Sequence, residues 1–65
     1  MTYRVIEKSG MNVRAKANGN SKKVGTVAYG SKIQSSKKSG NWAFIDSKKG
    51  WVCIKEGKTT YLKKI

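Results

Sequence analysis

The spacing of turn signals constrains this 65-residue chain more than any other feature. Short β-rich runs at residues 3–6, 11–14 and 24–28 alternate with clusters of glycine, serine, asparagine and lysine, and such a cluster recurs about every ten residues. No window has the 3.6-residue periodicity of an amphipathic helix. We therefore predict a single all-β domain over residues 1–65, built as a small sandwich or barrel.

The same signals divide the rest of the chain. The Gly/Asn-rich stretch 16–23 is predicted to be a loop. A strand is expected at residues 31–35, followed by a turn through Lys37-Lys38-Ser39-Gly40 and a hairpin over residues 40–53. A last pair of segments is expected around Glu56-Gly57-Lys58.

The hairpin GNWAFIDSKKGWVC, residues 40–53, holds both tryptophans, the only phenylalanine and the only cysteine. A four-residue loop at 47–50 would place Asp46 opposite Trp51. Because side chains alternate between the faces of a strand, this register separates two sets. One face carries Ala43, Ile45, Val52 and Ile54, and is predicted to build the core. The other carries Trp42, Phe44, Trp51 and Cys53.

The residues present exclude most catalytic chemistry. Cys53 is the only cysteine and histidine is absent, so no disulfide within the chain, no Cys–His nucleophile pair and no tetrahedral zinc set can form. The three acids, Glu7, Asp46 and Glu56, are scattered and predict no paired-carboxylate site. We expect no enzyme activity, no metal and no cofactor, and we interpret Cys53 as a small apolar residue.

No apolar run approaches the roughly 20 residues that span a bilayer, and we expect no membrane insertion. The first ten residues, MTYRVIEKSG, lack the apolar centre of a signal peptide. A role outside the cell would require another route of export or a place within a longer chain.

Fifteen basic residues against three acids give a net charge of +12. Residues 1–32 carry seven basic residues and one acid, and residues 33–65 carry eight and two, so each half contributes +6. Such a surface attracts polyanions: nucleic acid, an anionic membrane, or the anionic polymers of a bacterial wall. Solubility and protection of strand edges would explain the same lysines without any ligand.

Three segments in order resemble the bacterial SH3 (SH3b) domain. Residues 11–33, MNVRAKANGNSKKVGTVAYGSKI, are similar to that family's opening Leu-Asn-Val-Arg, polar loop and Val-x-Gly-Thr-Val. Residues 40–52, GNWAFIDSKKGWV, resemble its Gly-Trp hairpin, and Tyr61-Leu62 its closing Tyr-Leu. The chain departs from the family at Ala15-Lys16-Ala17, which replaces Ser-Gly-Pro. Residues 53–60 are longer than usual, which predicts an extra hairpin.

The resemblance implies a small, strongly bent SH3-like barrel of five to seven antiparallel strands that binds peptidoglycan or other wall polymers. Such domains anchor phage endolysins, autolysins and secreted wall hydrolases, so a parent catalytic domain is a possible partner. Eukaryotic relatives hold Pro-rich peptides with a Trp and a Tyr at the places of Trp42 and Tyr61. Their acidic loop is absent here, so Pro-rich recognition is discounted.

The predicted ligand-binding residues combine this resemblance with the chemistry of the side chains: Trp42, Trp51, Tyr61, Tyr29, Asn18 and Asn20. Flat aromatic faces suit sugar rings and peptide backbones, and amides can read a peptide stem. For each group a structural alternative stays open. The aromatic face, with Phe44, could be a second core, the tyrosines could be ordinary strand packing, and the two asparagines could be turn formers. Asn12 and Arg14 are interpreted as serving the fold.

The leading functional hypothesis is a non-catalytic wall-binding module, extracellular or wall-associated, from a Gram-positive bacterium or its phage. Its partners would be peptidoglycan and anionic wall polymers. The alternative is a small nucleic-acid-binding barrel that uses basic residues on phosphates and aromatic rings for base stacking. That alternative has no recognised nucleic-acid motif in its support.

Overall fold

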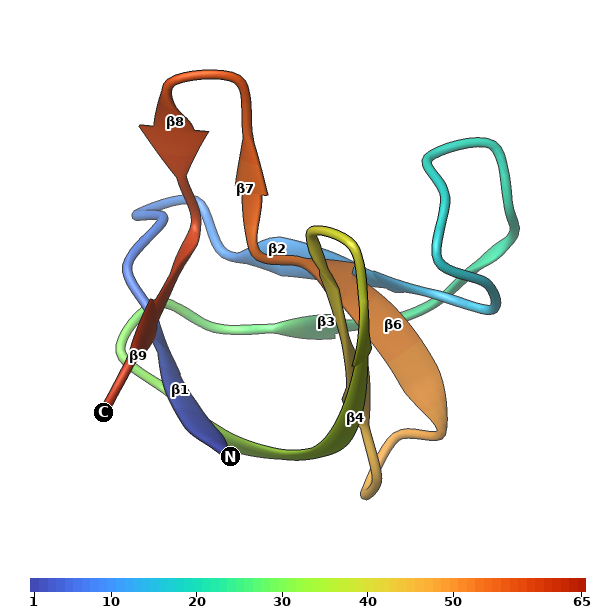
Figure 1. The fold of residues 1–65 in the computed structure, drawn as a ribbon, viewed down its shortest axis with the longest axis horizontal. Coiled ribbons are helices and arrows are strands. Elements are labelled where there is room, and N and C mark those ends of the chain that lie inside the picture. The colour runs from blue at the N-terminus through green and yellow to red at the C-terminus, as the bar shows by residue number, and fades with distance from the viewer.

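The computed structural model describes residues 1–65 and contains nine short strands and no helix (Figure 1). No helix in it could therefore cross a membrane. The strands in chain order are β1 (Thr2–Val5), β2 (Met11–Arg14), β3 (Lys23–Val27), β4 (Lys32–Ser39), β5 (Trp42–Ile45), β6 (Gly50–Cys53), β7 (Lys55–Glu56), β8 (Thr59–Thr60) and β9 (Leu62–Lys64).

Seven of the strands form one antiparallel sheet in the order β3-β2-β6-β5-β4-β1-β9. The sheet curves around a common interior, and the two-stranded β7–β8 hairpin projects from one end of it (Figure 1). The outermost strands β3 and β9 do not pair, so the barrel is open along one seam. The prediction of a small, bent, all-β barrel with up to seven antiparallel strands is confirmed, with β7–β8 added to it.

The core lies inside the curve and follows the alternation of side chains along the strands. It consists of Tyr3, Val5, Val13, Val27, Ile33, Ala43, Ile45, Val52 and Leu62. Met11 and Ile54 pack against it from partly buried positions. Ala43, Ile45 and Val52 have at most 1% of their surface exposed, which confirms the aliphatic face of the hairpin as the core face.

The predicted hairpin register is wrong by two residues. Phe44 rather than Asp46 lies opposite Trp51, Ile45 pairs with Gly50, and the loop is residues 46–49. Gly50 belongs to the sheet and not to the loop. β2 passes so close to it that a Cβ there would contact the Val13 side chain and lie 2.9 Å from the Arg14 carbonyl oxygen, so only glycine fits. A shift of two residues keeps every side chain on its face, so both predicted faces survive.

The predicted turn through residues 37–40 is also wrong, because β4 continues through Ser39. The turn is Gly40–Asn41, and Gly40 takes the positive φ of 56° that a tight hairpin favours at this position. A bulge at Ser36 changes which face the strand presents: Ser35 pairs with core-facing Ile45, whereas Lys37 pairs with Phe44. The buried Ser35 hydroxyl donates to the Lys37 carbonyl, 2.8 Å away.

The expected extra hairpin is present as β7–β8. Its turn is Gly57-Lys58, with Gly57 at a φ of 59°. The backbone amides of Tyr61 and Leu62 both donate to the Ile54 carbonyl, at 2.8 and 3.1 Å, and close the base of the hairpin. This closure holds Tyr61 beside the end of β6.

Candidate functional site

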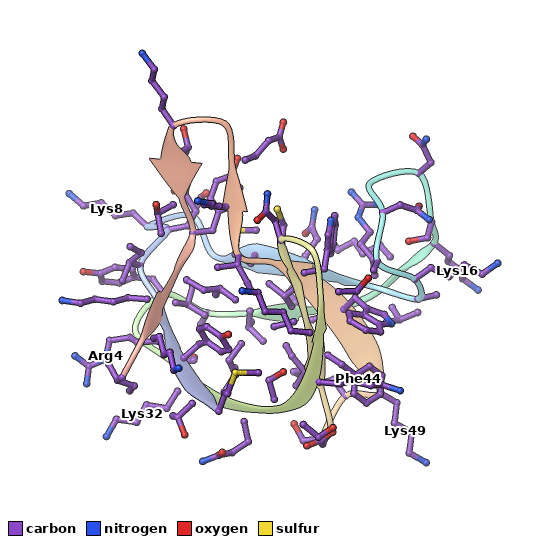
Figure 2. The ribbon with its side chains drawn as sticks, in the orientation of Figure 1. Arg4, Lys8, Lys16, Lys32, Phe44 and Lys49 are labelled. Atoms are coloured by element: carbon purple, nitrogen blue, oxygen red, sulfur yellow. The ribbon has the colours of Figure 1, made fainter.

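The outer face of the sheet presents a row of four opposed side chains across β2, β6, β5 and β4. Arg14 pairs with Trp51, Trp51 with Phe44, and Phe44 with Lys37. Directly opposed residues share a face, so two aromatic rings stand between two cations. The next row contains Cys53, Trp42 and Ser39. Figure 2 shows Phe44 on the outer side of the sheet, away from the interior.

The first row forms a packed unit, which we name the Phe44–Trp51 cluster and define as Lys37, Phe44 and Trp51. The two rings meet edge to face, with centroids 5.3 Å apart and planes inclined by 66°. The Lys37 Nζ lies 4.7 Å from the Phe44 centroid and 5.9 Å from that of Trp51. These distances are those of a cation–π contact. The rings are therefore engaged with one another and with Lys37.

Beside the second row lies a hollow of about 450 Å³, the Trp42–Tyr61 cavity. Its walls come from the β1–β2 loop, β2, the loop after β2, β5, β6, β7 and the segment before β9. The lining residues are Glu7, Ser9, Gly10, Met11, Asn12, Arg14, Gly19, Trp42, Cys53, Glu56 and Tyr61. The structure thus brings two predicted ligand-binding residues, Trp42 and Tyr61, into one cavity and leaves Trp51 outside it.

The charge of this lining is opposite in sign to that of the protein. Glu7 and Glu56 are two of the three acids in the chain, and Arg14 is the only cation in the lining. The lining therefore carries a formal charge of −1 in a protein of +12. Arg14 Nη1 donates to the Ser21 carbonyl, 3.1 Å away.

Two further side chains of the lining can ionise, the Tyr61 hydroxyl and the Cys53 thiol, and the surroundings favour the protonated form of each. Partial burial raises the pKa of the Tyr61 hydroxyl, and the charges of Glu56, Cys53 and Glu7 raise it further. Burial also raises the pKa of the Cys53 thiol, and the charge of Glu56 raises it further. The Sγ donates to the Lys55 carbonyl at 3.1 Å. At neutral pH the cavity therefore presents a phenol that can donate and a neutral thiol.

The predicted asparagines of the first loop lie outside the cavity lining. The backbone N–H of Asn20 donates to the Asn18 side-chain oxygen at 3.1 Å, which is the Asx-type geometry of a turn. The Ser21 hydroxyl lies inside the loop, within hydrogen-bond distance of both the Lys16 carbonyl, at 3.0 Å, and the Asn18 carbonyl, at 2.9 Å. Asn18 thus has the turn-forming geometry, and the loop reaches the cavity only through Gly19.

Asn12 and Arg14 combine a structural position with a place in the lining. Arg14 fixes the first loop through its bond to Ser21, as the interpretation of a fold-serving residue predicts. Both side chains nevertheless belong to the cavity wall. The sequence analysis assigned them to the fold alone, because the Asn-Val-Arg motif does not indicate which residues from other segments share a cavity with it.

Tyr29 lines a second hollow of about 350 Å³ together with Lys8. The two hollows share Ser9, Gly10, Met11 and Asn12, so they lie on either side of one rim. Tyr29 is 58% exposed. It is therefore separated from Trp42 and Tyr61 by the start of β2 and does not join their cavity.

Glu7 and Glu56 are the site residues that sequence reasoning missed. They are far apart in the chain, and neither belongs to a motif. The one available signal was the unusual length of residues 53–60, because the β7–β8 hairpin is what places Glu56 at the cavity.

The lysines and arginines outside this region are distributed around the molecule. Figure 2 shows Arg4, Lys8, Lys16, Lys32 and Lys49 pointing outward on different sides. The positive field therefore surrounds the whole fold, as the even split of charge along the sequence predicts.

The family model of the bacterial SH3 domain matches residues 9–62, which is most of the chain. No curated protein and no solved structure matches it.

Proposed function

Since this chain belongs to the bacterial SH3 domain family, a family of binding domains and not of enzymes, we propose that it is a wall-binding module. In this proposal it attaches a lytic or wall-associated protein to peptidoglycan and anionic wall polymers at the bacterial surface. The observation that supports this most directly is the meeting of Trp42 and Tyr61 in one cavity of about 450 Å³. A cavity of this size, in which Trp42 and Tyr61 stand among mostly polar lining residues, suits a small, polar segment of a wall polymer.

Binding would proceed in two stages. The +12 surface attracts the anionic wall over a range of about 10 Å at moderate ionic strength. The Trp42–Tyr61 cavity then makes the specific contacts, with Trp42 and Tyr61 as flat apolar walls and the protonated Tyr61 hydroxyl as a donor. The cavity is small, so single-site affinity is modest, and repeated epitopes on the wall increase retention.

The test is sedimentation with isolated Gram-positive walls, intact or stripped of teichoic acids, across a series of salt concentrations. Salt-resistant retention on stripped walls is the expected result, because the cavity contacts do not depend on the polyanion. Retention that disappears with salt or with the teichoic acids would mean that charge alone holds the protein.

One observation favours a second candidate, a nucleic-acid-binding barrel. The row Arg14, Trp51, Phe44 and Lys37 places two aromatic rings between two cations on the outer face. Single-stranded nucleic acids bind surfaces of this composition by stacking and phosphate contacts. The rings here contact one another and Lys37, which leaves less of each free for a base. A steep loss of single-stranded DNA binding with salt, and no retention on stripped walls, would favour this candidate.

A further inference from the structure

The Trp42–Tyr61 cavity carries a specificity that goes beyond wall attachment. We infer that it selects wall peptides bearing a free, protonated amine, and that Glu7 and Glu56 are the residues that select them. This inference rests on the proposed function, because it names which part of the wall enters the cavity.

The charge distribution is the first step. The whole molecule attracts anions, yet the cavity lining holds two of the chain's three acidic side chains and one cation. The third acid, Asp46, lies elsewhere and accepts a hydrogen bond from the Ser36 hydroxyl at 2.6 Å. An anionic ligand would meet its least favourable surface here. A ligand with a positively charged group would meet two acids and one base in this lining.

The aromatic walls are the second step. Trp and Tyr attract cations through the negative faces of their rings, and a tryptophan offers the strongest such contact. The same outer face already holds one ammonium in this way, since Lys37 Nζ sits 4.7 Å from the Phe44 centroid. Trp42 and Tyr61 in the cavity offer the same contact to an ammonium group that the protein does not supply itself.

The positioning of the carboxylates is the third step. The Ser9 amide and hydroxyl both bind Glu7 Oε1, at 3.4 and 3.3 Å, which orients this carboxylate and leaves its Oε2 for a ligand. Glu56 ends β7, and the β7–β8 pairing places it in the lining of the same cavity. The competing cation of the lining, Arg14, is directed at the Ser21 carbonyl.

This chemistry distinguishes two states of a wall peptide. An uncrosslinked diamino-acid side chain or free peptide N-terminus carries a protonated amine, whereas a crosslink converts that amine to a neutral amide. The cavity therefore favours uncrosslinked peptide over crosslinked peptide. A carboxylate–ammonium contact at an exposed rim contributes modestly, so two of them support a preference of about fivefold.

The test uses stripped walls whose amines have been acetylated. Acetylation makes the wall more negative, so general attraction to a +12 protein would increase. The inference predicts the opposite, a fall in retention of about fivefold relative to untreated stripped walls. Equal or greater retention on acetylated walls would overturn it. Absence of retention on both kinds of wall would instead contradict the proposed function.

Variants separate the cavity from the general field. The double variant Glu7→Gln, Glu56→Gln raises the net charge by two, and Asp46→Asn raises it by one outside the cavity. We expect the double variant to lose about fivefold in retention on untreated stripped walls and to equal the unmodified protein on acetylated walls. Asp46→Asn should bind each kind of wall as the unmodified protein does, including the fall on acetylated walls. A double variant that binds untreated walls as well as Asp46→Asn does would overturn the inference.

A measurement on the unmodified protein does not depend on either the wall or the variants. The two probes are the blocked peptide acetyl-Ala-Lys-Ala-amide and the same peptide with an Nε-acetylated lysine. Binding of each is monitored by NMR through the indole N–H resonances of the two tryptophans. The first peptide should shift the Trp42 resonance and leave that of Trp51, which lies outside the lining. The acetylated peptide should shift neither. Equal shifts of Trp42 with both peptides, or none with either, would contradict selection of an amine.

Discussion

Phe44 and Trp51 stand directly opposite each other on β5 and β6, with their ring centroids 5.3 Å apart and their planes at 66°. Their edge-to-face contact, capped by Lys37, separates the aromatic face of this hairpin into two parts. Trp51 belongs to a packed cluster, whereas Trp42, one row away, lines a cavity with Tyr61. The two tryptophans of the chain therefore have different surroundings, and different consequences are expected when each is removed.

Replacing Trp51 with Ala should destabilise the fold more than it weakens binding. The change removes the ring contact with Phe44 and one of the two rings beneath Lys37, and we expect a loss of about 2 kcal/mol in the free energy of unfolding. Urea unfolding followed by far-ultraviolet circular dichroism measures it. Under conditions where the variant is folded, its retention on stripped walls should be close to that of the unmodified protein. A stable variant that no longer binds walls would place Trp51 in the ligand site.

Replacing Trp42 with Ala should have the opposite balance. The cavity loses its largest apolar wall, and we expect retention on stripped walls to fall about tenfold, which corresponds to about 1.4 kcal/mol of binding free energy. Pelleting at fixed protein and wall concentration gives the value, and circular dichroism verifies that the variant is folded. Tyr29→Ala is the matched control, since Tyr29 lies across the rim in the second hollow. If Trp42→Ala binds as well as Tyr29→Ala, the ligand site lies elsewhere on the surface.

Replacing Gly50 with Ala should destabilise the sheet. The new Cβ would contact the Val13 side chain and lie 2.9 Å from the Arg14 carbonyl oxygen, so β2 and β6 must move apart. We expect a loss of about 2 kcal/mol in the free energy of unfolding, typical of overpacking in a core. Gly25→Ala is the control, on β3 at the other side of β2, because the nearest atoms there are 4.0 Å away. Equal midpoints of urea unfolding for the two variants would contradict the close approach of β2 and β6 at this position.

The stability of the protein should decline at alkaline pH. Burial and the Glu56 charge raise the pKa of the Cys53 thiol above its ordinary value. The folded state therefore keeps a proton that the unfolded chain has lost, and the free energy of unfolding falls as the pH rises above about 8.5. Cys53→Ala should show a shallower decline between about pH 8 and 10 than the unmodified protein. If the urea midpoints of Cys53→Ala and of the unmodified protein fall in parallel across this range, the thiol has the same pKa in the folded and unfolded states and the prediction is wrong. Tyr61, whose pKa is also raised by burial and by Glu56, adds a fall in the same direction at higher pH.

Local pattern was sufficient to predict which side chains of the hairpin face inward. Alternation depends only on neighbours along the strand, so Ala43, Ile45 and Val52 were assigned to the core without a partner strand. The register depended on Gly50, whose place is fixed by Val13 and Arg14 on β2. A contact between segments so distant in sequence leaves no local signal, and the loop was therefore displaced.

The wrongly placed turn through Lys37-Lys38-Ser39-Gly40 had a different cause. Polar composition there resembles a loop, but pairing with β5 keeps the segment extended, and the bulge at Ser36 turns Lys37 onto the aromatic face. In the candidate site, Trp42 and Tyr61 were predicted from the family resemblance and from their side-chain chemistry, and the structure places both in one cavity; that they bind a ligand stays a prediction. Glu7 and Glu56 were missed because only tertiary structure places them in one lining.

The order of strands in the sheet bears on how the chain reaches its folded state. β1 lies between β4 and β9, and its fully buried Val5 is opposite the equally buried Leu62. The first and last strands are thus neighbours. The entropy of the intervening chain must be lost before the stabilising contact between these two strands can form. During synthesis, β1 has no partner on its outer edge until β9 has left the ribosome. Folding is therefore expected to finish only after all the strands have been translated. A chain cut before residue 62 would lack β9, which would leave one edge of β1 unpaired and part of the core uncovered. We expect such a chain to be sensitive to proteases as a whole, which is a larger defect than a weakened ligand site.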